Sequence, residues 1–468
     1  MLEDRTNRSL EVLLPVRRGA GTLRGQLERQ LREAVRSGRL RPGSALPSSR
    51  ALAEQLQLSR GVVVEVYDQL VAEGYLVARQ GSATRVADAA LAGAATPSPA
   101  APSRRVRYDF RPGVPALDTF PRSAWLASLR KILRGAPHAA FGYGDTRGHA
   151  ALREALAAYL GRVRGVAADP ERILVCSGFA QGTALVCRAL RRRGARRFAI
   201  EDPSHPGQRA IVSRSGLELV AVPVDDRGIQ VDRLEAVGAD AVLVTPAHQF
   251  PTGMVLAPER RAALVDWAER NDTVIVEDDY DAEYRYDREP IGAVQGLAPG
   301  RVVYAGSASK TLAPALRLGW LVLPAGLADE VTEEKALDDL ASPVLEQLAF
   351  ADLLSLGQVD RHLRRNRARY RSRRDALVSA LRFHAPGVTV RGIAAGLHAV
   401  AELPPRVDEA AVVAAASRRS VGVYAMADYR FGGSAGPAAL VLGYGGLGEA
   451  AIERGVRLLA PAISVGSD

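Results

Sequence analysis

The sequence predicts an α/β protein with two domains, a small helical one that ends in a β-hairpin and a large one built on a mostly parallel sheet. Three observations lead to this prediction. The chain has 468 residues, too many for one compact core. Its positive charge is concentrated at the N-terminal end. Over much of the remainder, runs rich in β-branched residues alternate with helical segments, which is typical of a sheet with helices on both faces.

Charge and composition divide the chain into three segments. Residues 1–107 hold 17 Arg and no Lys against 10 Asp and Glu, a net charge of +7, whereas the whole chain carries +10. Residues 87–105 are rich in Ala, Pro and Ser and have almost no large apolar side chains, so they cannot build a core. We therefore predict a basic domain at 1–86, a linker at 87–107 and a second domain at 108–468. The basic domain suits a polyanionic partner.

The N-terminal segment has the pattern of three helices followed by a hairpin. Apolar residues from Leu23 to Val35 fall on one helical face, and a second helix begins near Ser48. A third helix spans 61–74, and 75–86 reads as two short strands around Gln80-Gly81. This order predicts a winged helix-turn-helix, in which the third helix enters the DNA major groove.

Four strand-to-loop junctions stand out in the larger domain. Each is a β-rich run followed by a polar or glycine-rich turn, and they lie at residues 172–182, 241–253, 273–284 and 301–320. In a parallel sheet the carboxyl ends of the strands share one edge, where ligands bind. We therefore expect the four turns to meet in one crevice.

The residues of these turns suit pyridoxal phosphate (PLP). Ser177–Gln181 opens a helix directly after a strand, where free N–H groups and the helix dipole favour a phosphate, and Arg317 would complete that site. Asp278 can pair with a protonated ring nitrogen, and Tyr280 can donate to a phenolate oxygen. The amine of Lys310 can form a Schiff base.

Lysine is rare in this chain, with Lys131, Lys310 and Lys335 among 62 Lys and Arg. A GC-rich genome explains the arginine excess. It does not explain Lys310, because only a primary amine can form the Schiff base.

Residues 46–82, LPSSRALAEQLQLSRGVVVEVYDQLVAEGYLVARQGS, closely resemble the DNA-binding domain of GntR-type regulators. The resemblance implies that the residues meeting double-stranded operator DNA are Arg50, Ser59, Arg60, Gln80 and Gly81. The family often carries a further arginine in the third helix, where this sequence has Val64.

From about Tyr108 to its end the chain resembles fold-type-I aminotransferases, which add a smaller C-terminal α+β subdomain to the parallel sheet. Joined to the winged helix, it resembles the MocR/GabR-type subfamily of GntR regulators. The resemblance places the Schiff base at Lys310. It implies that the other cofactor-binding residues are Asp278, Tyr280, Ser307, Ser309, Arg317, Phe179, Ala180, His205 and Tyr143. Tyr143 would reach the phosphate of a partner subunit, which requires a homodimer.

Three departures from the aminotransferase pattern bear on function. His205 replaces a common tyrosine near the cofactor ring, and Phe250 replaces an asparagine that bonds the ring oxygen, for which His248 or Gln249 is a possible substitute. Val441 occupies the place of the arginine that clamps the substrate carboxylate. Arg430 is the candidate residue for binding an effector in its stead.

The fusion predicts a transcriptional regulator whose aminotransferase-like domain senses PLP or an amine or amino-acid adduct of it, with control of vitamin B6 metabolism as one role. Because the clamp is missing, we expect weak or no transaminase activity. Two alternatives remain open. One is an active PLP-dependent aminotransferase with an accessory DNA-binding domain, and the other is a vestigial domain that serves only dimerisation.

The arginine-rich segment 361–375 holds eight Arg. Fold-type-I proteins have a long helix there that joins their two subdomains, which favours a solvated or interface helix. An auxiliary contact to DNA is the alternative interpretation.

Other classes of protein fit poorly. No apolar stretch of about 18 residues is present, and the start of the chain has early acids and no apolar signal core, so we expect a cytoplasmic protein with no membrane partner. Two cysteines and seven scattered histidines show no ligand spacing, so we expect no metal site.

Overall fold

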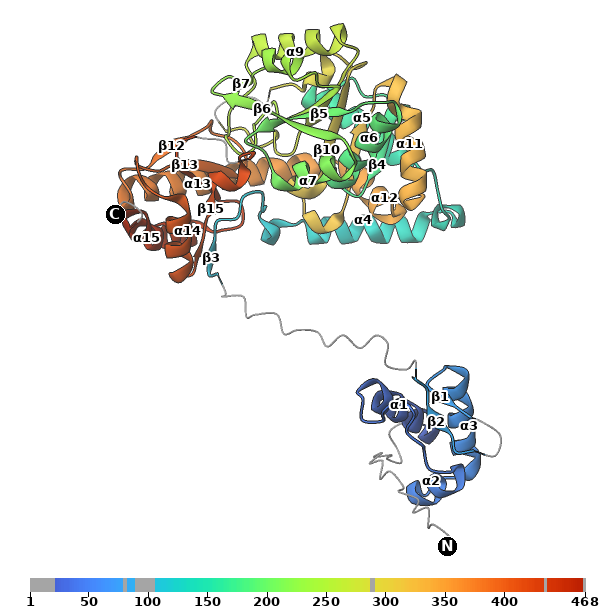
Figure 1. Ribbon diagram of the computed structural model, residues 1–468. Helices are drawn as coiled ribbons and strands as arrows, with labels where there is room; N and C mark the ends of the chain where they lie inside the picture. The colour runs from blue at the N-terminus through green and yellow to red at the C-terminus, as the bar shows by residue number, and fades with distance from the viewer. Residues whose placement is uncertain (1–21, 79–81, 89–105, 287–290, 433–435, 466–468) are drawn as a thin grey trace. The chain divides into compact units, whose positions relative to one another are not determined.

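The computed structural model describes residues 22–78, 82–88, 106–286, 291–432 and 436–465. The chain divides into two compact units, one within residues 1–103 and one within 104–468 (Figure 1). Each unit has its own hydrophobic core.

The N-terminal unit consists of three helices and a two-stranded hairpin, which confirms the predicted winged helix. Leu27 and Leu31 of the first helix are buried against Val63, Val66 and Leu70 of the third. The elements are α1 (Leu23–Arg36), α2 (Ser49–Leu56), α3 (Arg60–Ala72), β1 (Leu76–Val77) and β2 (Arg85–Val86), with the two strands antiparallel.

Hydroxyl side chains cap all three helices of this unit. Thr22 accepts a hydrogen bond from the Gly25 N–H, and Ser48 accepts one from Ala51. Ser59 accepts one from Val62 at 3.4 Å. These bonds satisfy N–H groups that have no acceptor within the helix. The caps fix where α2 and α3 begin, and hence which side chains their first turns present.

The larger unit is built on an eight-stranded sheet in the order β4-β11-β10-β9-β8-β5-β6-β7. Its strands are parallel except β11, which runs antiparallel to β4 and β10, and β7, which runs antiparallel to β6. The mostly parallel sheet is therefore confirmed. The strands are β4 (Ile173–Cys176), β5 (Arg197–Asp202), β6 (Glu218–Asp225), β7 (Gly228–Ile229), β8 (Ala241–Val244), β9 (Val274–Asp278), β10 (Val302–Ser307) and β11 (Gly319–Val322).

Helices cover both faces of this sheet (Figure 1). In β4, Leu174 and Cys176 belong to one hydrophobic cluster, and Ile173 and Val175 belong to another. Both faces are apolar because both are buried. The helices of this region are α4 (Arg122–Gly135), α5 (Ala150–Arg164), α6 (Phe179–Arg192), α7 (Pro206–Arg214), α8 (Asp232–Ala236), α9 (Pro258–Arg270), α10 (Ala308–Thr311), α11 (Ala325–Asp339) and α12 (Val344–Ser355).

A smaller α+β subdomain completes the unit. Its antiparallel sheet has the order β12-β13-β16-β15, and a separate parallel pair joins β3 to β14. The strands are β3 (Tyr108–Asp109), β12 (Thr389–Arg391), β13 (His398–Glu402), β14 (Val421–Gly422), β15 (Tyr424–Ala425) and β16 (Ala439–Gly443). The helices are α13 (Gln358–His384), α14 (Glu409–Arg418) and α15 (Glu449–Val465).

The long helix α13 contains the arginine-rich segment and contacts both subdomains. Arg367 and Arg371 donate to the backbone carbonyls of Glu283 and Tyr286, and Arg373 donates to that of Gly445. These arginines therefore have structural partners. Among the described residues, no helix has the length and apolar character needed to cross a membrane.

Candidate cofactor site and DNA-binding surface

A cavity of about 400 Å³ lies where β9 and β10 end. Residues from all four predicted turns line it, as the shared edge of a parallel sheet requires. Its volume is in the range of small-molecule sites. The residues predicted to bind the cofactor that line it are Phe179, Ala180, His205, Asp278, Tyr280, Ser307, Ser309, Lys310 and Arg317.

Lys310 lies on the short helix α10, directly after β10. Its Nζ atom donates to the backbone carbonyl of Gly113 at 2.7 Å. Burial lowers the pKa of the Lys310 amine, and the nearby carboxylates of Asp278 and Asp281 act in the opposite direction. A lowered pKa increases the unprotonated fraction, which is the form that attacks an aldehyde.

Asp278 is the last residue of β9 and is buried. Its Oδ2 atom accepts a hydrogen bond from Gln208 Nε2 at 2.7 Å. Burial, and then the charge of Asp279, raise the pKa of Asp278 well above its usual range. No other described residue donates a hydrogen bond to this carboxylate, so a pyridinium N–H would supply the missing donor and a compensating charge. The site thus fits a protonated ring nitrogen.

The residues around the start of α6 fit a phosphate. Helix α6 begins at Phe179 after Gly178, whose φ of +88° lies in the region that favours glycine. A Cβ atom on Gly319 would lie 2.7 Å from the Gly178 Cα, so β11 can approach the helix start only without a side chain there. Arg317 donates to the Ser177 carbonyl. The guanidinium therefore lies beside the free N–H groups of the first helical turn, an arrangement that binds anions.

His205 lines the cavity beside Phe250, with the two ring centroids 5.6 Å apart. Its Nδ1 atom accepts a hydrogen bond from the Gly207 N–H, which caps α7. Burial, and then the charge of Lys310, lower the pKa of His205. An imidazole that lines the cavity and whose lowered pKa favours the neutral form suits stacking on a cofactor ring.

Tyr280 has partners that the sequence did not reveal. Its hydroxyl lies 3.1 Å from His248 Nδ1, and that nitrogen lies 3.1 Å from both carboxylate oxygens of Asp281. When Nδ1 carries a proton for Asp281, the Tyr280 hydroxyl keeps its own proton for another acceptor. The sequence offered His248 or Gln249 as a possible substitute for the asparagine, and it gave no signal for Gln208.

His248, Asp281 and His398 are all buried, and their ligand atoms lie within 4.8 Å of one another, so this group could hold a metal ion. Within the described part of the chain, His398 Nδ1 has no hydrogen-bond partner. Burial, and then His248, lower the pKa of His398 to about 3. Their positions in the sequence show no ligand spacing, because they lie in three separate segments.

Tyr143 does not line the cavity of its own subunit. Its side chain is 86% exposed, and it borders a separate pocket with Pro343 and Val344.

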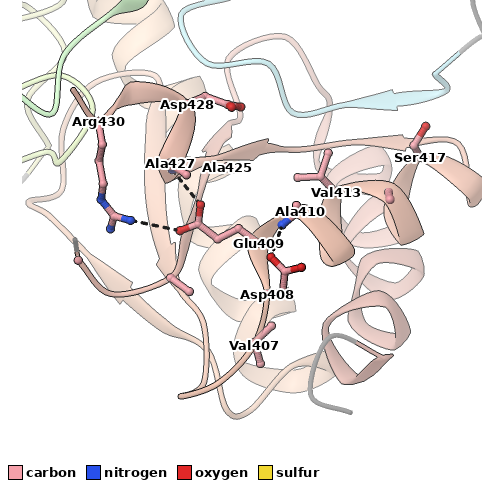
Figure 2. Close-up of a pocket in the computed structure, with 13 residues that line it drawn as sticks. Val407, Asp408, Glu409, Ala410, Val413, Ser417, Ala425, Ala427, Asp428 and Arg430 are labelled. Atoms are coloured by element: carbon pink, nitrogen blue, oxygen red, sulfur yellow. Dashed lines mark hydrogen bonds and ion pairs between the residues drawn. The ribbon is translucent and has the colours of Figure 1, made fainter. Parts of the chain in front are cut away.

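Val441 and Arg430, the positions considered for carboxylate binding, also lie outside the cavity. Val441 has no exposed surface and packs with Phe250, Val400 and Met426 in an apolar cluster. Arg430 lines a different pocket of about 710 Å³, where Nη1 lies 3.8 Å from Oε1 of Glu409 (Figure 2). The structure therefore does not bring Arg430 to the cofactor cavity.

The side chains predicted to meet DNA lie at the starts of α2 and α3. Arg50, Ser59 and Arg60 are exposed, and neither guanidinium forms a hydrogen bond or ion pair with another residue of the described ranges. Ser59 is also the cap of α3. Gln80 and Gly81 lie outside the described residues.

Comparison with known proteins accounts for both units. The family model "Bacterial regulatory proteins, gntR family" matches residues 23–86, and "Aminotransferase class I and II" matches residues 113–438. A pyridoxine biosynthesis transcriptional regulator, PdxR of Corynebacterium glutamicum, is 35% identical, with 94% of this chain and 96% of that protein covered. The chain belongs to the MocR/GabR-type GntR regulators. The probable rhizopine catabolism regulator MocR of Rhizobium meliloti is 34% identical, with 93% of each chain covered.

Solved aminotransferases share the fold of this regulator's larger unit. The kynurenine aminotransferase of Pyrococcus horikoshii, solved in complex with PMP, has a TM-score of 0.70 and 26% identity, covering 78% of this chain and 92% of its own. The α-aminoadipate aminotransferase LysN of Thermus thermophilus has a TM-score of 0.69 and 26% identity, covering 78% and 93%. The predicted fold-type-I architecture is confirmed, and the GntR domain indicates that the regulator binds DNA.

Proposed function

We propose that this regulator binds PLP in the cavity and that PLP itself is the effector that controls its binding to an operator. One contrast carries the proposal. The cavity offers a group for the aldehyde, the ring nitrogen and the phosphate of PLP, whereas Val441, at the place of a carboxylate clamp, is packed in an apolar cluster. The match to a pyridoxine biosynthesis regulator supports a role in vitamin B6 metabolism.

Each group in the cavity has a separate task. When bound, the cofactor supplies an aldehyde that reacts with primary amines. Lys310 provides that amine, and its lowered pKa favours the reactive form. Asp278, whose carboxylate accepts a hydrogen bond from Gln208, would hold a proton on the ring nitrogen. Tyr280 would donate toward the ring oxygen, and His205 would stack on the ring.

The phosphate would be bound by the N–H groups of Phe179 and Ala180 together with Arg317, Ser307 and Ser309. Several donors on one anion give affinity without reaction, which suits a sensor. Under this proposal the domain serves as a PLP-binding effector domain at 108–468, with little or no transaminase activity.

On the DNA side, Arg50 and Arg60 would contact phosphates or guanine edges, with Ser59 beside them and Gln80 and Gly81 in the wing. A protein with this partner works where the chromosome lies, so we place it in the cytoplasm.

We also propose a homodimer. Tyr143 is too exposed to serve its own cavity and would reach the phosphate site of the partner subunit. Leu126 and Leu133 on α4 and Phe141 nearby are about half exposed, which suits a contact between two copies. Light scattering on the eluted protein should give twice the chain mass, and a monomer at working concentration would contradict the proposed partner role of Tyr143.

The proposal is tested by titrating the protein onto the DNA upstream of its own gene, with and without PLP. We expect PLP to change the affinity or the footprint, and no change in either would overturn PLP as effector. An effect seen only with an added amine or amino acid would instead favour an adduct as effector.

The aminotransferase alternative has its own measurement. Single-turnover absorbance spectra with a panel of amino acids should show little conversion to the pyridoxamine form. Efficient conversion would make this chain a working enzyme. A vestigial domain would give no PLP absorbance at all, with or without Lys310→Ala.

A further inference from the structure

The segment that follows the linker reaches the cofactor cavity. We call residues 108–116 the strap. Its first part is β3, which pairs with β14, and the carbonyl of Phe110 accepts a hydrogen bond from the Gly443 N–H at 2.8 Å. At its other end, the Ala116 N–H donates to the Tyr370 hydroxyl at 2.8 Å. The strap is thus bound at both ends.

Between these ends the strap backbone lies directly on two glycines. A Cβ atom on Gly443 would lie 2.1 Å from the Arg111 carbonyl oxygen, and one on Gly445 would lie 2.4 Å from that of Val114. No side chain fits there, so strap and subdomain meet backbone to backbone. Because no side chain lies between them to adjust, a small shift at one point of the strap must be taken up by neighbouring residues of the strap itself.

The middle of the strap forms part of the cavity wall. Pro112 and Gly113 line it, and the Gly113 carbonyl accepts the hydrogen bond from Lys310 Nζ. Gly113 has a φ of +75°, and a Cβ atom on it would lie 3.3 Å from that nitrogen. Within the described residues, this carbonyl is the one hydrogen-bond partner of the Lys310 amine.

Covalent binding of PLP changes the hydrogens on this nitrogen. A neutral primary amine carries two N–H hydrogens. When the Lys310 nitrogen forms a double bond to the aldehyde carbon, the carbon–oxygen bond breaks and the oxygen leaves as water with both hydrogens. The nitrogen then carries at most one further proton, which the ring oxygen of the cofactor attracts. The Gly113 carbonyl loses its donor.

We propose that the Lys310 amine holds the strap in the PLP-free protein and that bonding to PLP releases the strap. The strap would thereby transmit the presence of PLP in the cavity to the linker that joins it to the DNA-binding domain. This inference rests on the proposed function. It identifies two states that PLP distinguishes, which a coupling between two sites requires.

Hydrogen exchange of the full-length protein, read by mass spectrometry, tests the release. With PLP bound, we expect the hydrogen-bonded strap amides of Phe110 and Ala116 to exchange about two- to tenfold faster, because the loss of one hydrogen bond makes opening of the strap easier by that factor. Lys310→Met keeps the apolar stem and removes the donor, so it should show the faster exchange without PLP and no further change with it. Lys131→Met is the matched control, because Lys131 pairs with Asp352 away from the strap.

The outcomes separate this inference from the proposed function. Absorbance reports PLP on Lys310 independently, so bound PLP with unchanged strap exchange overturns the release while leaving PLP binding intact. If PLP does not bind, the proposed function fails, and Lys310→Met still tests the hydrogen bond. The last measurement is the affinity for operator DNA. Lys310→Met without PLP should match the wild type with PLP, and a match to the PLP-free wild type overturns transmission by the strap.

Discussion

Two valines occupy positions where the family resemblance leads us to expect arginine, and they lie in different environments. Val441 on β16 has no exposed surface and belongs to an apolar cluster with Phe250 and Met426. Val64 on α3 is 37% exposed, in the helix expected to enter the DNA groove. Valine is therefore part of the core at position 441, whereas at position 64 it lies at the surface.

This difference separates two kinds of functional change. Val441 is packed in a largely apolar cluster, so we expect that Val441→Arg alone does not form a carboxylate clamp. Val64 is 37% exposed, so an arginine in its place can extend into solvent. Val441→Arg should therefore alter ligand binding and stability together, and Val64→Arg should alter DNA affinity alone.

Val441→Arg should have the largest effect. An unpaired guanidinium in an apolar cluster lowers the free energy of unfolding by about 3–5 kcal/mol. Denaturation can be followed by fluorescence, because all three tryptophans, Trp125, Trp267 and Trp320, lie in the larger unit. A variant of unchanged stability that gains affinity for amino acids would show that the clamp site is intact and that the contrast is false.

Asp278→Asn removes the charge opposite the ring nitrogen and keeps the shape of the side chain. Charged hydrogen bonds contribute about 1.5–3 kcal/mol, so PLP affinity should fall by about 10- to 150-fold. The measurement is a PLP titration followed by absorbance. Asp266→Asn, on the exposed side of α9, is the matched control and should bind PLP like the wild type. Equal PLP affinities in the two variants would show that Asp278 does not take part in PLP binding.

Arg60→Ala should weaken operator binding by about 1–3 kcal/mol if the side chain reads a base. A phosphate contact would instead lower affinity on every sequence and reduce the salt slope by about one. Arg39→Ala is the control, because this exposed arginine bonds Ser37 at the far end of α1. If Arg60→Ala binds its operator as the wild type does, α3 is not the recognition helix.

Val64→Arg should have the smallest effect on the fold, within about 0.5 kcal/mol of the wild type. If α3 lies in the groove, the added charge should raise DNA affinity and steepen the salt dependence by about one ion. Measuring the DNA affinity of this variant and of the wild type at several salt concentrations tests this prediction. An unchanged salt slope would place Val64 away from DNA.

The sequence predicted those parts of the molecule that depend on local pattern and strand direction. The four turns lie on one cavity because parallel strands end at the same edge, and Lys310 stood out because lysine is so rare. Tertiary contacts were not predictable. Nothing in their spacing brings Gln208 to Asp278 or Gly113 to Lys310, because those contacts join segments far apart in the chain. The spacing of Arg430 in the sequence likewise did not indicate where its side chain lies, and Arg430 lines another pocket.

The central claim is that PLP and DNA binding are coupled, and it is tested most directly in reverse. If PLP changes the affinity for the operator by some factor, the operator must change the affinity for PLP by the same factor. PLP is titrated against the full-length protein with and without saturating operator duplex, and loading of Lys310 is read by absorbance. We predict two different affinities whose ratio equals that from the DNA titration. Identical PLP affinities in both titrations would contradict the account.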